Sequence, residues 1–287
     1  MQAEDRKESV IAVSVDEHIG VFSPACAVRR NKPARAQKQC FTFGSVWSQW
    51  PAAPLCASFH RRDTMASTTI QCTDGFELGA YEAVPAGDAK GAVVVIQEVF
   101  GVNSHIRSVV DDYAAEGFYA IAPAIFDRLE RDVQLDYSES GMTKGIELAF
   151  QQLDMTQTLA DLQATIGHAS HHGKVGIVGY CFGGLLTWLS SCQLENVSAA
   201  SAYYGGGIPD NAALSPSCPT ILHFGELDAH IPMASVTAFQ EQKPDLPVHI
   251  YAADHGFNCD QRDAYDATAA TAAKARTLAL FSAELGA

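Results

Sequence analysis

The stretch that decides the fold is residues 174–184, which read KVGIVGYCFGG. Its first six residues form a mainly apolar run, which is typical of a β-strand covered on both faces. A helical pattern begins directly after it, at Phe182, and continues to about Cys192. The central Gly-x-Cys-x-Gly pattern therefore lies at a sharp strand-to-helix turn, where the two glycines let the backbone bend and lift the Cys181 side chain above the sheet.

Strand and helix patterns alternate on both sides of this turn. The alternation predicts a mostly parallel, doubly wound α/β sheet with helices on both faces. Residues 126–143 are polar and irregular, so we expect them to form a loop over a site. The first two strands flank Thr73-Asp74-Gly75, which predicts a hairpin. We expect strands at residues 69–72, 76–82, 92–97, 119–123, 174–179, 198–204, 220–224 and 248–251, and helices at residues 105–116, 144–168, 182–192, 233–240 and 263–285.

The chain divides into an N-terminal extension, residues 1–64, and one domain, residues 65–287. The extension holds nine basic and six acidic residues without sustained apolar periodicity, so we expect it to be poorly ordered. Two alternatives stay open, namely a targeting peptide and a true start at Met65. Its acidic opening does not fit a secretory or transit signal.

Composition excludes several classes of function. The 19 basic and 33 acidic residues give a net charge of −14, which is opposite to the basic surface that nucleic-acid binding requires. No stretch approaches the roughly 18 apolar residues of a membrane-spanning helix. The eight cysteines are scattered without a C-x-x-C pair, so we expect free thiols in a reducing cytoplasm and no zinc cluster.

Cys181 is the candidate nucleophile, because a helix N-terminus favours a thiolate and an adjacent base completes its ionisation. In enzymes with such a turn, the acid and then the histidine follow on loops after later strands. Asp228 follows the strand at 220–224, and His255 follows the strand at 248–251. We therefore expect His255 to act as base and acid, and Asp228 to orient its ring.

Rival residues fit these roles less well. Asp254 is adjacent to His255 in sequence and should project elsewhere, and Glu226 comes two residues too early. His223 lies inside a strand, where a packed core histidine is expected, and His230 is expected at the surface.

The segment from Gln97 to Asn103 follows the first buried strand, where half of an oxyanion hole is expected. The backbone N–H groups of Val99 and Phe182 are the candidate donors to a tetrahedral oxyanion. Glu98 would lie beside the thiol, where its carboxylate opposes thiolate formation.

These motifs resemble the dienelactone hydrolases (carboxymethylenebutenolidases) of the α/β-hydrolase superfamily. The resemblance covers about residues 68–285 and rests on residues 97–103, residues 179–184, Tyr203-Tyr204-Gly205, and the Asp228 and His255 loops in matching order. It implies a Cys-His-Asp triad that acts on a small enol-lactone or ester through an acyl-enzyme. It also implies that Glu98 interacts with the resting thiol and moves aside for substrate, and that no metal or organic cofactor is needed. Separately from this resemblance, we expect a cytoplasmic monomer.

The chain departs from this family where the substrate carboxylate binds. The family uses two arginines and a serine, and this chain has Gly256 and Cys259 at two of these positions and no arginine near Thr143–Lys144. A lysine does not replace a bidentate arginine. Hydrolase chemistry is therefore better supported than dienelactone as the substrate. The candidate substrate-binding residues are Lys144, Tyr204, Phe257 and Arg262.

Three other functions share some of these sequence features. A class I glutamine amidotransferase also uses Gly-x-Cys-x-Gly, but it requires a His-x-Glu motif downstream, and none follows Cys181. An esterase or thioesterase for other small substrates stays open. So does a non-catalytic binding protein with the same fold.

Overall fold

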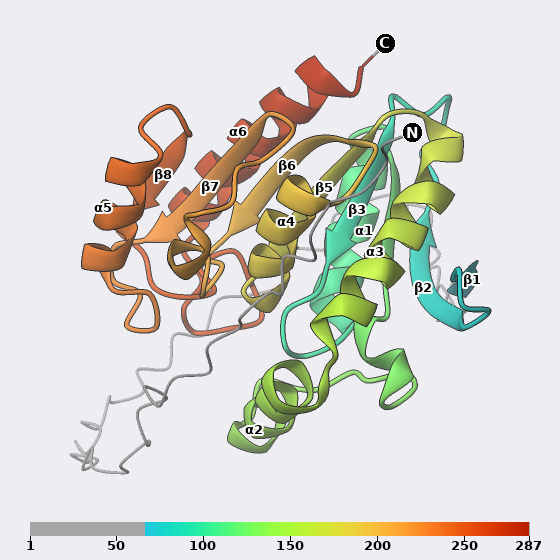
Figure 1. Ribbon diagram of the computed structural model, residues 1–287, viewed down its shortest axis with the longest axis horizontal. Coiled ribbons are helices and arrows are strands. Elements are labelled where there is room, and N and C mark those ends of the chain that lie inside the picture. Colours follow the sequence, from blue (N-terminus) through green and yellow to red (C-terminus); the bar gives the residue numbers. More distant parts are fainter. Residues whose placement is uncertain (1–66, 287) are drawn as a thin grey trace, which may run out of the picture. The chain divides into compact units, whose positions relative to one another are not determined.

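The computed structural model describes residues 67–286, and the predicted extension at residues 1–64 lies outside them. The described part folds around an eight-stranded sheet with the order β1-β2-β4-β3-β5-β6-β7-β8 (Figure 1). The strands are β1 (Ser67–Gln71), β2 (Glu77–Ala83), β3 (Ala92–Ile96), β4 (Tyr119–Pro123), β5 (Val175–Tyr180), β6 (Val197–Tyr203), β7 (Thr220–Gly225) and β8 (Val248–Tyr251).

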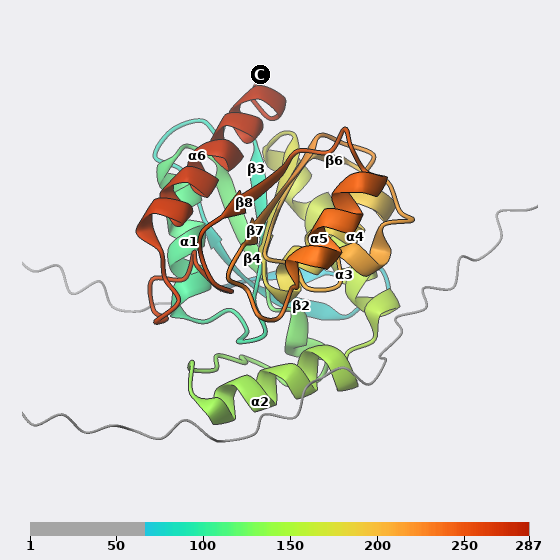
Figure 2. The same ribbon diagram turned by 90° about the vertical axis from the view of Figure 1, so that its left-hand side faces the viewer.

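The sheet is parallel from β4 to β8, whereas β1 and β2 form the predicted antiparallel hairpin at its edge. Helices cover both faces, with α1 and α6 on one side and α3, α4 and α5 on the other (Figure 2). This covering explains why β3, β4 and β5 are buried along their whole length. The predicted fold class is confirmed. The helices are α1 (Ser104–Ala115), α2 (Glu139–Glu147), α3 (Met155–Ala169), α4 (Phe182–Gln193), α5 (Met233–Gln242) and α6 (Ala267–Glu284).

The single helix expected over residues 144–168 is wrong, because the structure divides it into α2 and α3. A π-helical turn over Leu148–Gln152 ends the first part, and Asp154 begins the second by accepting a hydrogen bond from the N–H of Gln157 at 3.0 Å. An aspartate at this position stabilises a new helix start. Helix α2 also begins inside the expected loop, at Glu139, after the cap residue Ser138.

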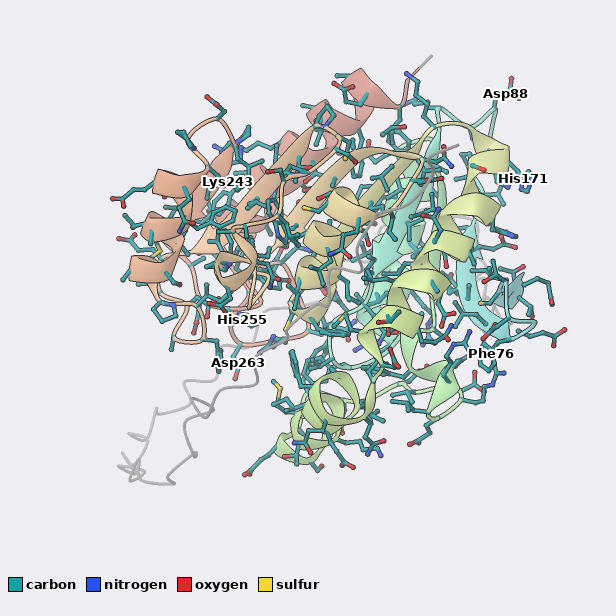
Figure 3. All side chains as sticks on the ribbon, in the orientation of Figure 1. Phe76, Asp88, His171, Lys243, His255 and Asp263 are labelled. Atoms are coloured by element: carbon teal, nitrogen blue, oxygen red, sulfur yellow. The ribbon has the colours of Figure 1, made fainter. Side chains whose placement is uncertain are left out.

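The carboxyl ends of the parallel strands meet at one edge of the sheet, where ligand sites of such folds form. Figure 3 labels His255 beyond the ends of β7 and β8, on the same side as α2. No helix within residues 67–286 is long and apolar enough to cross a membrane.

Candidate active site

Cys181 lies at the turn between β5 and α4 with a backbone φ of +55°, which is a strained conformation for a residue other than glycine. The turn is also tightly packed. A Cβ atom on Gly179 would lie 2.1 Å from the carbonyl oxygen of Gly183, and a Cβ on Gly183 would lie 2.4 Å from that of Ile96. Both glycines are therefore required, and together they hold Cys181 above the end of the sheet.

His255 and Asp228 come together from the loops after β8 and β7. The Nδ1 atom of His255 lies 2.7 Å from Oδ2 of Asp228, whose side chain is fully buried. The other oxygen, Oδ1, accepts hydrogen bonds from the backbone N–H groups of His230 and Ile231 at 2.8 and 3.2 Å. Burial opposes the charge of Asp228, but the hydrogen bond and charge of His255 outweigh it and lower the pKa of the carboxyl.

His255 also interacts with Cys181, which is one of the groups that act on the pKa of its imidazole. The imidazole is largely enclosed, with 11% of its side chain exposed. Burial alone would lower its pKa, but the charge of Cys181 and the hydrogen bonds with Asp228 and Cys181 raise the pKa of His255 to about 10. The structure thus brings together the three residues that the sequence singled out.

The rival residues lie where the sequence predicts them. His223 is fully buried in β7, with Nδ1 2.8 Å from the Tyr251 hydroxyl, so it is a packed core histidine. His230 is exposed, although its ring centroid lies 5.3 Å from that of His255. Asp254 is exposed and accepts from the backbone N–H of His255 instead of contacting its ring, and Glu226 is exposed.

Val99 and Phe182, the candidate oxyanion donors, are both buried. Phe182 is the first residue of α4, so its N–H has no partner within the helix. Among the described residues, neither backbone N–H donates a hydrogen bond to another protein group. Both donors are therefore available to a ligand.

Glu98 is fully buried beside these groups. Neither carboxylate oxygen accepts a hydrogen bond from a described residue, so Glu98 does not hold the Cys181 thiol by a hydrogen bond in this state. Glu98 forms an ion pair with Arg262, whose Nη1 atom lies 3.9 Å from Oε1. The influence of Glu98 on the thiol stays a prediction.

Arg262 reaches the site through the space that Gly256 leaves open. A Cβ atom on Gly256 would lie 2.4 Å from Nη1 of Arg262. The guanidinium also lies over the rings of Phe100 and Tyr137, 5.9 Å from each centroid. The glycine, where the resemblance would place a serine, and the shifted arginine thus fit each other.

The other candidate substrate-binding residues differ in their surroundings. Lys144, on α2, forms an ion pair with Glu130 at 3.4 Å instead of with a residue of the site. The ring of Tyr204 lies 5.1 Å from that of His255, and its buried hydroxyl has no partner among the described residues. Phe257 is fully buried, and its ring lies 5.1 Å from that of Tyr204. Substrate contacts of these residues stay predictions.

Two further residues, His105 and Tyr137, border the site and were not predicted to do so. Cys259, which stands where the resemblance would place a substrate-binding arginine, borders the site as well. The Cys259 thiol donates to the Tyr137 hydroxyl at 3.2 Å, which brings the expected loop at residues 126–143 to the site. Burial is the main cause that raises the pKa of Cys259 to about 11. These residues are widely separated in sequence and form no local motif. As expected, Cys72, Cys181, Cys192, Cys218 and Cys259 are free thiols; the other three cysteines lie outside the described residues.

Comparison with known proteins points to one family. The model of the dienelactone hydrolase family matches residues 78–285. A "Putative carboxymethylenebutenolidase" of Synechocystis sp. is 36% identical over 230 residues, and the carboxymethylenebutenolidase of Pseudomonas putida is 33% identical over 220. Each alignment covers 73% of this chain and 93% of the relative.

Solved structures agree with this result. The crystal structure of a "Putative Dienelactone Hydrolase" from Klebsiella pneumoniae matches with a TM-score of 0.66 and 28% identity, covering 75% of this chain and 97% of that one. An esterase from Pyrococcus furiosus, 14% identical with a TM-score of 0.58, shares the fold. The chain belongs to the dienelactone hydrolase family and is a hydrolase with the α/β-hydrolase fold.

Proposed function

We propose that the chain hydrolyses small carboxylic esters or lactones with Cys181 as nucleophile, His255 as base and acid, and Asp228 as the residue that orients His255. The observation that carries this proposal is the position of His255 between two partners. Its Nδ1 is 2.7 Å from Oδ2 of Asp228, and Cys181 raises the pKa of the same imidazole against the effect of burial. This is the relay that activates a nucleophile for acyl transfer.

In the first half-reaction, the Cys181 sulfur attacks the substrate carbonyl carbon. The carbonyl oxygen becomes an oxyanion that accepts hydrogen bonds from the N–H groups of Val99 and Phe182. His255 holds the thiol proton and transfers it to the departing ester oxygen as the carbon–oxygen bond breaks. In a lactone, this oxygen remains attached to the acyl group, so the ring opens while a thioester forms at Cys181.

In the second half-reaction, His255 takes a proton from water, and the resulting hydroxide attacks the thioester carbonyl. The same N–H groups stabilise the second oxyanion. The carbon–sulfur bond then breaks, the carboxylic acid leaves, and the proton returns to the sulfur. Throughout, Asp228 keeps the proton of the imidazole on Nδ1, so that Nε2 faces the sulfur.

The charges around the site favour uncharged substrates. Arg262 already pairs with Glu98, and Lys144 with Glu130, so a substrate carboxylate would have to compete with a protein carboxylate for either cation. We expect neutral aryl esters and thioesters to have higher kcat/KM values than lactones that carry a carboxylate. A panel of both substrate types at equal ionic strength measures this preference, and a preference for carboxylated lactones would contradict it.

The triad is tested with Cys181→Ala and His255→Ala. We expect each variant to lose at least about 100-fold in kcat on p-nitrophenyl acetate, and Cys181→Ala to yield no acylated protein in quenched mass spectra. Cys192→Ser, which removes a thiol from the far end of α4, should keep full activity. A non-catalytic binding protein would give no turnover in any of these forms, and unchanged turnover in His255→Ala would exclude its role as base.

A further inference from the structure

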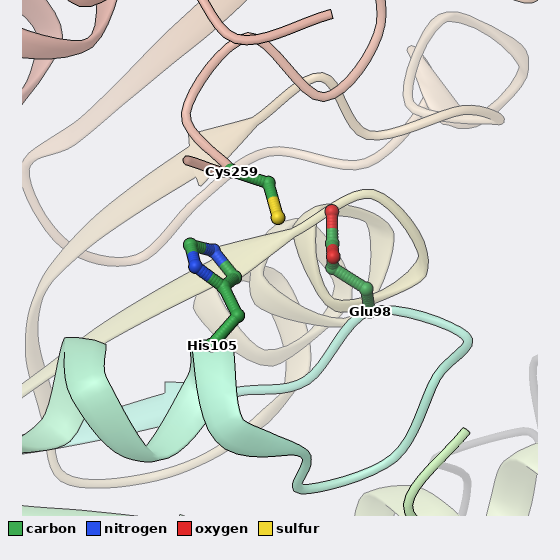
Figure 4. Close-up of side chains that lie close together, drawn as sticks. All are labelled: Glu98, His105 and Cys259. Atoms are coloured by element: carbon green, nitrogen blue, oxygen red, sulfur yellow. The ribbon is translucent and has the colours of Figure 1, made fainter. Parts of the chain in front are cut away.

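Three buried side chains with different metal-binding atoms converge next to the proposed triad. Glu98 follows β3, His105 lies in the first turn of α1, and Cys259 lies in the loop after β8. Their carboxylate, imidazole and thiol ligand atoms all lie within 4.8 Å of one another. Figure 4 shows the three side chains pointing toward one another from three separate segments.

Two of these side chains have unused hydrogen-bonding capacity. Both carboxylate oxygens of Glu98 and the Nε2 atom of His105 are buried without a hydrogen-bond partner among the described residues. Glu98 is 0% exposed and His105 is 3% exposed. Burying polar atoms without partners is costly, so such groups in a native protein commonly serve a ligand.

The groups around the cluster leave these atoms available. The other ring nitrogen of His105, Nδ1, lies 3.3 Å from Oδ1 of Asp260, so Nε2 is the nitrogen that remains open toward the cluster. A carboxylate behind a histidine is the usual partner of a metal-binding imidazole. Arg262 is the competing cation, but at 3.9 Å from Glu98 it is beyond hydrogen-bond distance.

We propose that Glu98, His105 and Cys259 bind one divalent cation of the zinc class. Sulfur, nitrogen and oxygen donors together suit Zn²⁺ or Co²⁺ and not Mg²⁺ or Ca²⁺, which prefer oxygen donors. Donor atoms around tetrahedral zinc lie about 3.4–3.8 Å apart, so the three atoms would need to approach one another by at most about 1.4 Å. The Cys259 thiol releases its proton to solvent as the metal–sulfur bond forms, and water fills the fourth position.

This cation is an inhibitor and not a reactant, so hydrolysis without a cofactor is still expected. The cation site adjoins the proposed oxyanion hole, because Val99 is the residue after Glu98. A bound cation would hold Glu98 in place and restrain the Val99 N–H beside it, so we expect reversible inhibition of hydrolysis. Only this inhibitory effect rests on the proposed function.

The test is a titration of the full-length protein with Co²⁺ after treatment with EDTA and dialysis. We expect one equivalent to bind with the near-ultraviolet absorption of a cobalt–thiolate bond, and Zn²⁺ to displace it. Cys259→Ser should abolish this absorption. Asp260→Asn, which changes an exposed carboxylate, should weaken binding by about 10- to 100-fold.

Two control variants separate this site from other thiols. Cys181→Ala should bind Co²⁺ with the same absorption although it cannot turn over substrate, and Cys192→Ser should match the wild type. Absorption that persists in Cys259→Ser, or disappears in Cys181→Ala, would overturn the assignment, as would the absence of binding. Because binding is read from absorption, its result is independent of whether the chain hydrolyses esters.

Discussion

At the scale of single residues, Asp228 accepts hydrogen bonds from three donors at once. Oδ1 holds two backbone N–H groups, and Oδ2 holds the ring of His255. In Asp228→Asn, the amide oxygen can keep the backbone contacts, so the fold is preserved. The amide NH₂ would then face Nδ1 and favour the tautomer with its proton on Nε2, which cannot accept the thiol proton.

We therefore expect Asp228→Asn to lower kcat by about 100- to 10,000-fold, with little change in KM or in the melting temperature. Steady-state kinetics on a neutral aryl ester, together with a thermal melt, measure all three quantities. A large drop in melting temperature together with the loss of activity would instead mean that Asp228 acts mainly on the structure of its loop.

The raised pKa of His255 makes stability depend on pH in a definite direction. The pKa rises from 6.5 to about 10 in the folded protein, so the folded state binds this proton more tightly than the unfolded chain. The resulting stabilisation is fully present below pH 6.5 and is lost as the pH rises through about 10. Each pH unit between the two values corresponds to about 1.4 kcal/mol.

Chemical denaturation at several pH values measures this contribution. Between pH 7 and pH 9 the free energy of unfolding of the wild type should fall by about 2–3 kcal/mol relative to His255→Gln. The decrease should be smaller in Asp228→Asn, because that variant lacks the carboxylate whose hydrogen bond and charge help to raise the pKa of His255. If the free energy of unfolding of the wild type relative to His255→Gln stays constant with pH, the ion pair between His255 and Asp228 is contradicted.

The pairing of Asp228 with His255 could be predicted from the sequence, because each residue follows a recognisable parallel strand and such strands end at one edge. The convergence of His105 and Cys259 with Glu98 could not. Their positions depend on how a helix start and two loops pack in three dimensions, and no spacing in the sequence records this packing.

At the scale of elements, the turn between β5 and α4 depends on the close approach of α4 to β3. In Gly183→Ala, the new Cβ would lie 2.4 and 2.5 Å from the carbonyl oxygens of Ile96 and Gln97. Backbone atoms cannot move aside as a flexible side chain can, so α4 must shift, at a cost of about 1–3 kcal/mol. The shift would also displace the N–H of Phe182 from the oxyanion site.

We expect Gly183→Ala to lower the melting temperature by about 2–4 °C for each kcal/mol of unfolding free energy that is lost. It should lower kcat as well. Gly167→Ala in α3 is the matched control, because a Cβ there meets no atom within 4 Å and alanine favours a helix by up to about 1 kcal/mol. Calorimetry and kinetics on both variants test this. A Gly183→Ala protein as stable and active as the control would show that the turn tolerates a side chain.

The elements themselves were largely predictable, for a physical reason. Continuous apolar runs bounded by turn residues mark strands that helices cover on both faces, and β4 and β8 begin and end where the pattern placed them. The boundary between α2 and α3 was missed because apolar residues keep their helical spacing across it. Only the capping role of Asp154 marks the break, and a single aspartate within a helical pattern is a weak signal.

At the scale of the whole molecule, charge should influence which substrates reach the site. The chain carries a net charge of −14, so its field lowers the local concentration of anionic substrates and leaves neutral ones unaffected. Arg262 would act in the opposite direction, but its charge is offset by Glu98 at 3.9 Å. The long-range repulsion should therefore outweigh the local attraction.

Salt separates these two effects, because it screens charges over about 10 Å at 0.1 M ionic strength. If repulsion dominates, kcat/KM for a carboxylated lactone rises several-fold between 10 and 200 mM NaCl through a lower KM, while the value for a neutral aryl ester stays constant. A fall with added salt would mean that Arg262 attracts the substrate carboxylate more strongly than the whole molecule repels it. In that case Arg262→Gln should remove the salt dependence, and the preference for uncharged substrates would be wrong.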